Sequence, residues 1–210
     1  MTDPLDAGRR DSAGPLLDQL AVAGLVRRER DARDHGRWEE MASSFAPDSV
    51  VHISWFHGSG AEFVAGSRKI AASGLTGRHR LWPSLVRCNG DRAIAETDMA
   101  VELRRRVGGV EVDNTAYARL LTRARRTPDG WRIVRFESIY QRDALVPVVP
   151  GTAPEIRPED LEKYRPSYRF LSYLMALDGH ELAQDLPGDD RPELARAVRD
   201  AALDWLDTGR

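Results

Sequence analysis

The spacing of apolar and polar residues changes character twice along this chain. Up to about residue 46, apolar residues recur at intervals of three and four, which is typical of amphipathic helices. From Val50 the pattern becomes β-branched, aromatic and alternating, and it predicts strands. After Tyr140 a proline-rich stretch leads back to helical spacing. Helices followed by a run of long strands predict an α+β fold, with the helices packed on one face of a curved sheet.

The N-terminal part predicts two helices. Residues 1–14 are polar and contain Gly and Pro, which favours a flexible N-terminal arm. The first helix is expected to run from about Pro15 to His35-Gly36, where the glycine suits the left-handed cap. Its buried side is predicted to carry Leu16, Leu17, Leu20 and Leu25. A second helix is predicted to place Trp38, Met41, Ala42 and Phe45 on one stripe and to stop at Pro47-Asp48.

The central part predicts strands with one helix between them. The segment VVHISWF reads as a strand that turns at HGSG, and a short strand EFV is expected next. Ser67 is predicted to cap a third helix that reaches about Leu75. Beyond Pro83, four strands are expected, separated by turns at Asn89-Gly90, Gly108-Gly109 and TPDG. The Asn-Gly pair is a strong hairpin signal, because both central residues of a type I′ turn need positive φ.

Composition and charge narrow the function classes. The formal net charge is −2 with five histidines taken as neutral, so no excess of positive charge favours nucleic acid or an anionic membrane surface. A lone Cys88 excludes an internal disulfide and a cysteine-based zinc site, and it fits a reducing compartment. There is no apolar run of the ~20 residues that a membrane span needs, and no signal-peptide pattern. We expect a cytoplasmic protein.

Two polar residues far apart in the sequence are the candidates for chemistry. Asp34 ends the first helix, in RERDARDHGRWEEM, and His79 lies in GRHRLWP. A carboxylate that accepts one ring N–H of a histidine fixes its tautomer and leaves the other nitrogen free to take a proton. The helix macrodipole disfavours a negative charge at a C-terminus, so helix stability does not explain Asp34. The alternative is that both side chains are solvated, one in a turn and the other between two arginines.

The chain resembles the SnoaL-like branch of the nuclear transport factor 2-like superfamily, which includes scytalone dehydratase and bile-acid dehydratases. The resemblance rests on ARDHGRWEEMASSFAPDSVVH, the His79 segment, the NGDRAIAE hairpin and DGWRIVRFESIYQRD. It implies a cone-shaped, curved, mixed or antiparallel sheet with the N-terminal helices on the concave side and a deep apolar pocket. It implies catalytic roles for Asp34 and His79, which match the dehydratases' Asp and His. The Tyr that dehydratases carry before the Asp is absent, since VRRERDARD has Glu29 or Arg30 there.

Other residues are candidates for the pocket wall. Trp55, Trp82, Asn114 and Tyr117 are predicted to contact substrate, although both tryptophans suit a core equally well. Tyr117 or Tyr140 is a candidate to replace the missing Tyr if it faces inward. His52 and His57 fit no tight metal motif with His79, so we expect no metal site. Walker, Gly-x-Gly-x-x-Gly and Gly-x-Ser-x-Gly motifs are absent, so we expect no cofactor.

These observations predict a domain at 15–145 and a C-terminal extension at 146–210. The extension, with its apolar last helix, is expected to cover the pocket mouth or to form a dimer interface in a homodimer or higher homo-oligomer. The leading hypothesis is a cofactor-independent dehydratase, isomerase or cyclase. Its substrate would be a small hydrophobic molecule, cyclic in the favoured interpretation. The alternatives are a non-catalytic binding or assembly module and an epoxide hydrolase-like enzyme, which would need more carboxylates.

Overall fold

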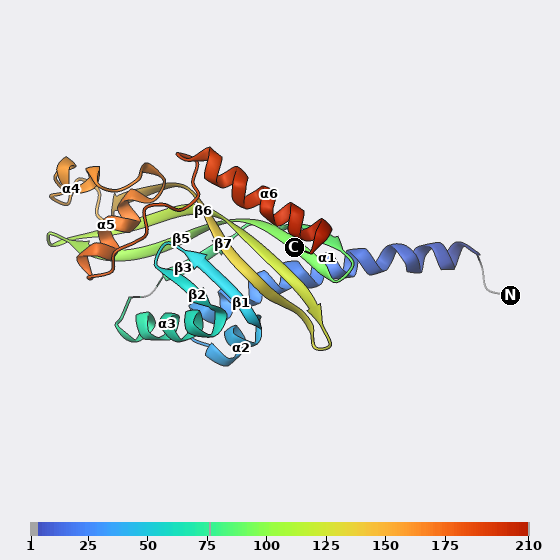
Figure 1. The fold of residues 1–210 in the computed structure, drawn as a ribbon. Coiled ribbons are helices and arrows are strands. Elements are labelled where there is room, and N and C mark those ends of the chain that lie inside the picture. Colours follow the sequence, from blue (N-terminus) through green and yellow to red (C-terminus); the bar gives the residue numbers. More distant parts are fainter. Residues whose placement is uncertain (1–3, 76, 210) are drawn as a thin grey trace.

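A computed structural model describes residues 4–75 and 77–209, in which helices flank one curved sheet (Figure 1). The helices are α1 (Pro4–Asp34), α2 (Trp38–Ser43), α3 (Gly60–Ala72), α4 (Pro158–Glu162), α5 (Arg169–Leu177) and α6 (Pro192–Thr208), with a short 3-10 turn at Pro166–Tyr168. The strands are β1 (Phe45–Ile53), β2 (Phe56–Ser59), β3 (Gly77–Leu81), β4 (Leu85–Asn89), β5 (Arg92–Val107), β6 (Val110–Thr127) and β7 (Gly130–Pro147). The predicted α+β class is confirmed.

The strands form a seven-stranded sheet in the order β2-β1-β7-β6-β5-β3, and β4 also pairs with β5. The β1–β7 pair is parallel and the other pairs are antiparallel. The long β5–β6–β7 meander follows the predicted turns, and Gly90, Gly108 and Gly109 have φ of 57°, 54° and 83°. Those conformations suit glycine, so the turn signals in the sequence fix the register of the meander.

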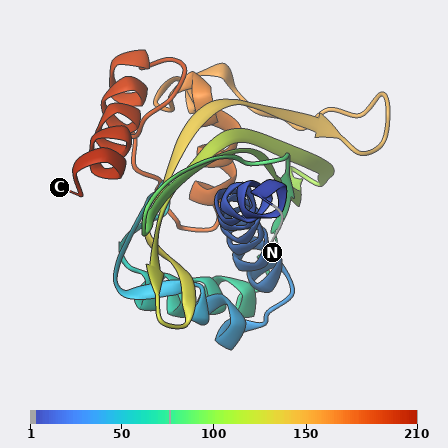
Figure 2. The ribbon, with the colours of Figure 1, turned by 90° about the vertical axis from the view of Figure 1, so that its right-hand side faces the viewer.

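The two faces of the sheet are covered by different parts of the chain. Figure 2 shows α1 lying inside the curve of the sheet and α6 outside it. Residues alternate between the faces along each strand. On β6, Ala116, Ala118 and Leu120 belong to the main core, whereas Leu121 packs with α6. The concave face therefore holds the main core, and the convex face carries a smaller core under α6.

The first helix differs from its prediction at its N-terminal end. It begins at Pro4, and Pro15 lies inside it. Leu16, Leu17 and Leu20, expected to be buried, are 57%, 63% and 61% exposed. The core contacts begin further along, at Val22, Leu25 and Val26. Sequence periodicity predicts the helix, but it does not show which of its turns pack on the sheet, because this depends on the length of the concave face.

The segment between residues 45 and 75 contains three further corrections. Phe45 begins β1 and is not part of the second helix, which ends at Ser43. The predicted strand EFV lies inside α3, which starts at Gly60 and not after Ser67. Its N-cap is Ser59, whose hydroxyl accepts a hydrogen bond from the Glu62 backbone N–H while the Glu62 carboxylate bonds back to Ser59. This Ser-x-x-Glu capping box was readable in the sequence.

The C-terminal extension packs against both faces of the sheet. An extra residue in β7, Gln141, shifts the pairing between Tyr117 and Ala118, and beyond it Asp143 accepts the Leu171 backbone N–H at 2.8 Å. This bond fixes the start of α5 on the concave side. On the convex side, Ala202 and Leu206 of α6 pack on Ile94 and Leu121. The apolar face of the last helix therefore packs on the sheet of its own domain.

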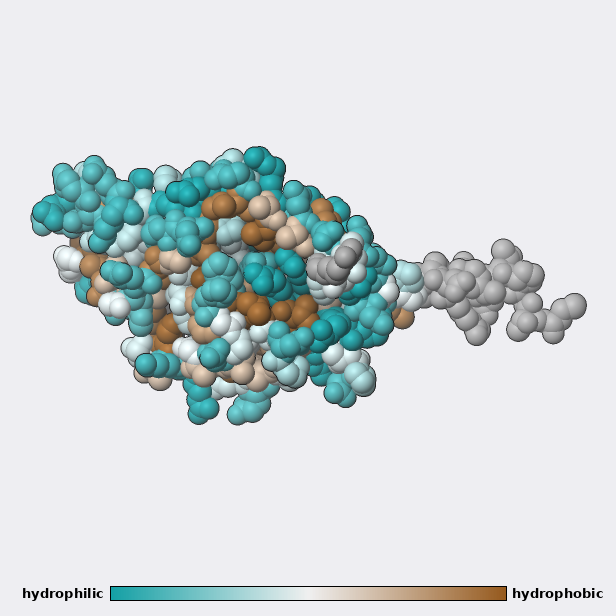
Figure 3. Space-filling view, viewed as in Figure 1, coloured by the Kyte–Doolittle hydropathy of each residue, from teal (hydrophilic) through white to brown (hydrophobic). Residues whose placement is uncertain are grey.

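The surface mixes polar and apolar residues. On the face in Figure 3, apolar residues lie in small groups among polar ones. Within the described part of the chain, none of the helices has the length and apolar character needed to cross a membrane.

Candidate functional site

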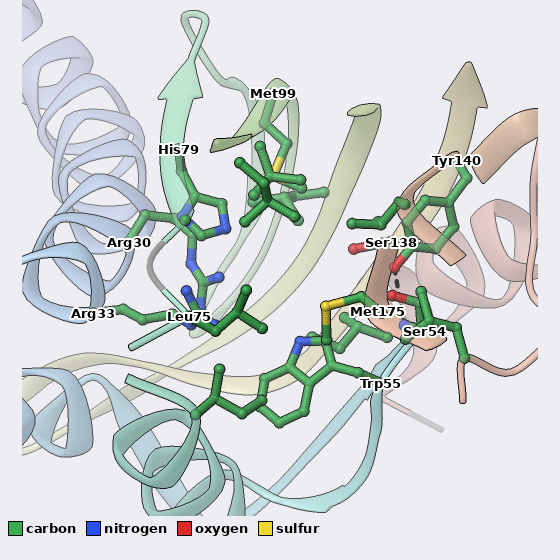
Figure 4. Close-up of a pocket in the computed structure, with 18 of the residues that line it drawn as sticks. Arg30, Arg33, Ser54, Trp55, Leu75, His79, Met99, Ser138, Tyr140 and Met175 are labelled. Atoms are coloured by element: carbon green, nitrogen blue, oxygen red, sulfur yellow. Dashed lines mark hydrogen bonds between the residues drawn. The ribbon is translucent and has the colours of Figure 1, made fainter. Parts of the chain in front are cut away.

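An apolar cavity lies between α1, α3, the concave face of the sheet and the C-terminal extension (Figure 4). Most of its wall is aliphatic or aromatic. The polar or charged groups that line it are Arg30, Arg33, Ser54, His79, Ser138 and Tyr140. They form two groups, because His79 and the arginines lie on the α1 side and the three hydroxyl residues lie opposite (Figure 4). A largely apolar cavity with a few convergent polar groups is the usual form of a small-molecule site.

Asp34 and His79 meet beside this cavity. His79 Nδ1 lies 2.6 Å from Asp34 Oδ1, and the His79 backbone N–H donates to Asp34 Oδ2, also over 2.6 Å. Both side chains are buried, with exposed fractions of 7% and 6%. α1 ends at Asp34 and β3 carries His79 on the concave face, so the fold joins residues 45 positions apart. We call this pair the dyad.

The electrostatics of the dyad favour an ionised aspartate and a neutral histidine. Burial raises the pKa of Asp34, but the two hydrogen bonds from His79 outweigh it and hold that pKa below its ordinary value. Burial lowers the pKa of His79 to about 4, and the nearby Arg30 and Arg33 act in the same direction against the hydrogen bond to Asp34. Neutral His79 then donates its Nδ1–H to Asp34, which leaves Nε2 with a free lone pair.

Two arginines of α1 share the wall next to His79. Arg30 is buried, forms two hydrogen bonds to the carboxylate of Glu29, and places its guanidinium 4.7 Å from the centre of the Phe136 ring. Arg33 donates from Nε to Ser67 Oγ at 3.3 Å, and its ion pair with Asp34 spans 4.0 Å. The sequence contained a signal for these residues, since positions 30, 33 and 34 share one face of a helix.

The opposite wall carries three hydroxyl groups. The Tyr140 hydroxyl accepts the Ser54 backbone N–H at 2.9 Å, and Ser138 lies two residues earlier on the same face of β7. Burial raises the pKa of Tyr140 more than these hydrogen bonds lower it, so the phenol keeps its proton. Tyr140 thus faces the cavity, as one of the two tyrosines considered from the sequence. Ser54 and Ser138 were not foreseen.

The C-terminal extension completes the cavity wall. Leu171 and Met175 of α5 and Leu182 beyond it line the cavity together with residues of the sheet. Figure 4 shows Met175 between the His79 side and the Tyr140 side. Leu171 and Met175 lie four residues apart, and therefore on one face of the helix. The extension, expected to cover a pocket mouth or to form an interface, supplies part of the pocket.

Of the four residues predicted to contact substrate, the structure places one at this cavity. Trp55 lines it. Trp82 is 50% exposed, beyond the end of β3. Asn114 is buried but donates its amide to the Ala144 carbonyl at 2.9 Å. Tyr117 lies under the guanidinium of Arg142, on the convex side of β6. Trp82, Asn114 and Tyr117 are therefore absent from the described cavity wall.

The remaining histidine pair lies on the other face of the sheet. His52 and His57 are cross-strand partners whose rings stack with centres 4.4 Å apart. His52 is also paired in register with Glu137, whose carboxylate lies 2.9 Å from Arg135 and 3.6 Å from Arg123. We call these five residues the convex cluster. Because His79 points to the concave face, the three histidines do not converge.

The comparison with known proteins agrees with this architecture. A model of the SnoaL-like domain matches residues 14–137, more than half of the chain. The chain belongs to the SnoaL-like domain family. An uncharacterized protein of Emericella nidulans is 32% identical over 222 residues, covering 98% of this chain and 93% of that protein.

Two solved structures share the SnoaL-like fold at low sequence identity. A protein assigned as a scytalone dehydratase from Novosphingobium aromaticivorans has a TM-score of 0.54 and 15% identity, over 68% of this chain and 95% of that one. A type 2 hexachlorocyclohexane dehydrochlorinase has a TM-score of 0.53 and 14% identity, over 72% of this chain and 99% of that one. At such identities, the likeness shows the fold alone.

Proposed function

We propose that this protein is a cofactor-independent general acid/base enzyme of the dehydratase, isomerase or cyclase type. The observation that carries the proposal is the dyad, in which a buried carboxylate holds the Nδ1 side of a histidine that lines an apolar cavity. A small hydrophobic, cyclic molecule suits the wall. The same fold occurs in an assigned dehydratase and in a dehydrochlorinase.

In this proposal, His79 is the base and Asp34 is the carboxylate that orients it. Nε2 takes a proton from a carbon beside a carbonyl or similar group, and the C–H electron pair moves into the substrate. In an elimination, this pair forms the new double bond as the leaving group departs with its own electrons. The ionised Asp34 stabilises the imidazolium that forms, and the apolar wall keeps water from competing for the proton.

The same contacts bear on the alternatives. A binding module has no need of a carboxylate that accepts two hydrogen bonds from a histidine and fixes its tautomer. The convex cluster shows that histidines of this fold also occur without such an arrangement. An epoxide hydrolase needs carboxylates around a water molecule, whereas the described residues of the cavity wall include no Asp or Glu.

The test uses a substrate that reports a base directly. 5-Nitrobenzisoxazole loses its C–H proton as its N–O bond breaks, and it releases a coloured cyanophenolate. We expect the wild type to accelerate this reaction and His79→Ala to lower kcat/KM by ~10²-fold or more. His52→Ala, a histidine outside the cavity, is the control and should keep the wild-type rate. Absence of acceleration, or equal rates for wild type and a folded His79→Ala, would refute the proposal.

A further inference from the structure

Arg33 is a largely buried cation that, among the described residues, hydrogen-bonds to a hydroxyl and not to a carboxylate. Its side chain is 14% exposed, and its ion pair within the described residues is the 4.0 Å approach to Asp34. Asp34 already accepts two hydrogen bonds from His79. Burial, with a contribution from Arg30, lowers the pKa of Arg33 to about 10, and it remains protonated at neutral pH. The guanidinium retains capacity to donate hydrogen bonds to a ligand.

Arg30, one turn earlier on the same helix, provides an internal comparison. Its guanidinium makes two hydrogen bonds to Glu29 and lies against Phe63 and Phe136. Its charge is therefore neutralised by a neighbour, and its planar group is held by packing. Both arginines line the cavity beside His79 (Figure 4). Arg30 is hydrogen-bonded to its carboxylate, whereas in the described part of the chain Arg33 only approaches Asp34 at 4.0 Å.

We infer that Arg33 is a catalytic residue that stabilises the oxyanion formed when His79 removes a proton, and that the substrate is uncharged until that step. This rests on the proposed function. The charges support it, because Glu29 and Asp34 balance Arg30 and Arg33 while His79 is neutral. Proton transfer creates an imidazolium and a substrate oxyanion together, so the site stays neutral overall. A permanently anionic ligand would instead leave an unbalanced buried charge.

Arg33 and His79 are also coupled electrostatically. Arg30 and Arg33 both disfavour a proton on His79. An oxyanion beside Arg33 offsets one of these cations, so the pKa of His79 rises as the reaction proceeds. The unfavourable effect of Arg33 on the imidazolium is therefore cancelled at the step at which the substrate becomes an anion. A carbonyl compound with an acidic C–H, or a phenol, has the required chemistry.

The test measures ionisation, which needs no turnover. 2-Naphthol is flat, apolar and uncharged, and its absorbance and fluorescence distinguish phenol from phenolate. We expect wild type to bind it and to lower its pKa relative to water. Arg33→Gln should raise the pKa of the bound naphthol by about one to three pH units. Arg33→Lys should retain most of the effect. Arg68→Gln, an exposed arginine of α3, is the matched control and should behave as wild type.

Each outcome decides a separate point. An equal naphthol pKa in wild type and folded Arg33→Gln would overturn the role of Arg33, as would failure of wild type to bind or ionise naphthol. Tighter binding of 2-naphthoate, a permanent anion, than of 2-naphthol would overturn the uncharged substrate. His79→Ala in the benzisoxazole assay reports on the base alone. The two assays thus distinguish a site in which His79 is the base but Arg33 has no role from a site in which His79 itself has no role.

Discussion

The concave and convex faces of the sheet each carry histidine, arginine and carboxylate side chains, but they arrange them differently. On the concave face, Asp34 fixes one nitrogen of His79 and an apolar cavity receives the other side of the ring. On the convex face, His52 and His57 stack on each other, and Glu137 is shared by two arginines. The same residue types thus form a histidine with one fixed nitrogen in one place and a charge network in the other. Position relative to an enclosed cavity makes the difference.

Because one half of the C-terminal extension covers the concave face and the other the convex face, we expect removal of each half to affect folding and activity differently. Truncation after Pro150 removes buried residues, among them Tyr168, Leu174 and Leu186, and opens the cavity. Losing so much core should leave little soluble folded protein. Truncation after Arg191 removes α6 alone, which exposes Ile94 and Leu121, and should yield a less stable protein that still turns over benzisoxazole. Soluble yield, melting temperature and rate measure both. A soluble, active protein ending at Pro150 with an unchanged oligomeric state would contradict this view of the extension.

Neutralising Asp34 should lower the reaction rate, whereas neutralising Glu137 should lower the free energy of unfolding. Asp34→Asn removes the group that fixes the tautomer of His79, so kcat/KM for benzisoxazole should fall by ~10²-fold. Glu137→Gln leaves Arg123 and Arg135 without their shared anion and should lower the free energy of unfolding by about 3 kcal/mol, with the rate unchanged. Urea unfolding and steady-state kinetics on both variants measure this. A rate loss in Glu137→Gln that matches that of Asp34→Asn would remove the distinction between the faces.

Local sequence signals account for much of the concave face. The helical run that ends near Gly36 and the glycine turns of the meander predicted α1 and β5 to β7, because helix caps and turns depend on nearby residues. Asp34 and His79 were selected by combining residue chemistry with family resemblance. Their contact could not be read from spacing, because it depends on where α1 crosses β3.

The sequence predictions that were wrong concern features that are set by tertiary geometry. Which face of β6 is concave determines the surroundings of Tyr117, and alternation alone gives two equivalent answers. Asn114 lies on the same face as Ala116, but its amide is bonded to the Ala144 carbonyl. Leu16 and Leu20 have the pattern of a buried stripe, but they are exposed, and the side of α1 that meets the sheet there carries Asp18, which pairs with Arg126. The contributions of Leu171 and Met175 depend on α5 folding back, which follows from the bond between Asp143 and Leu171.

The pH dependence of kcat/KM tests most directly whether a neutral, buried His79 is the base. Because the pKa of His79 is lowered from 6.5 to about 4, its imidazole stays unprotonated as the pH falls through the usual range for histidine. The rate constant for benzisoxazole, measured while circular dichroism shows folded protein, should stay level from pH 8 to about 5.5 and decline only toward pH 4. A base with an ordinary histidine pKa would lose about nine-tenths of the rate by pH 5.5. A decline centred near pH 6.5 would contradict the account.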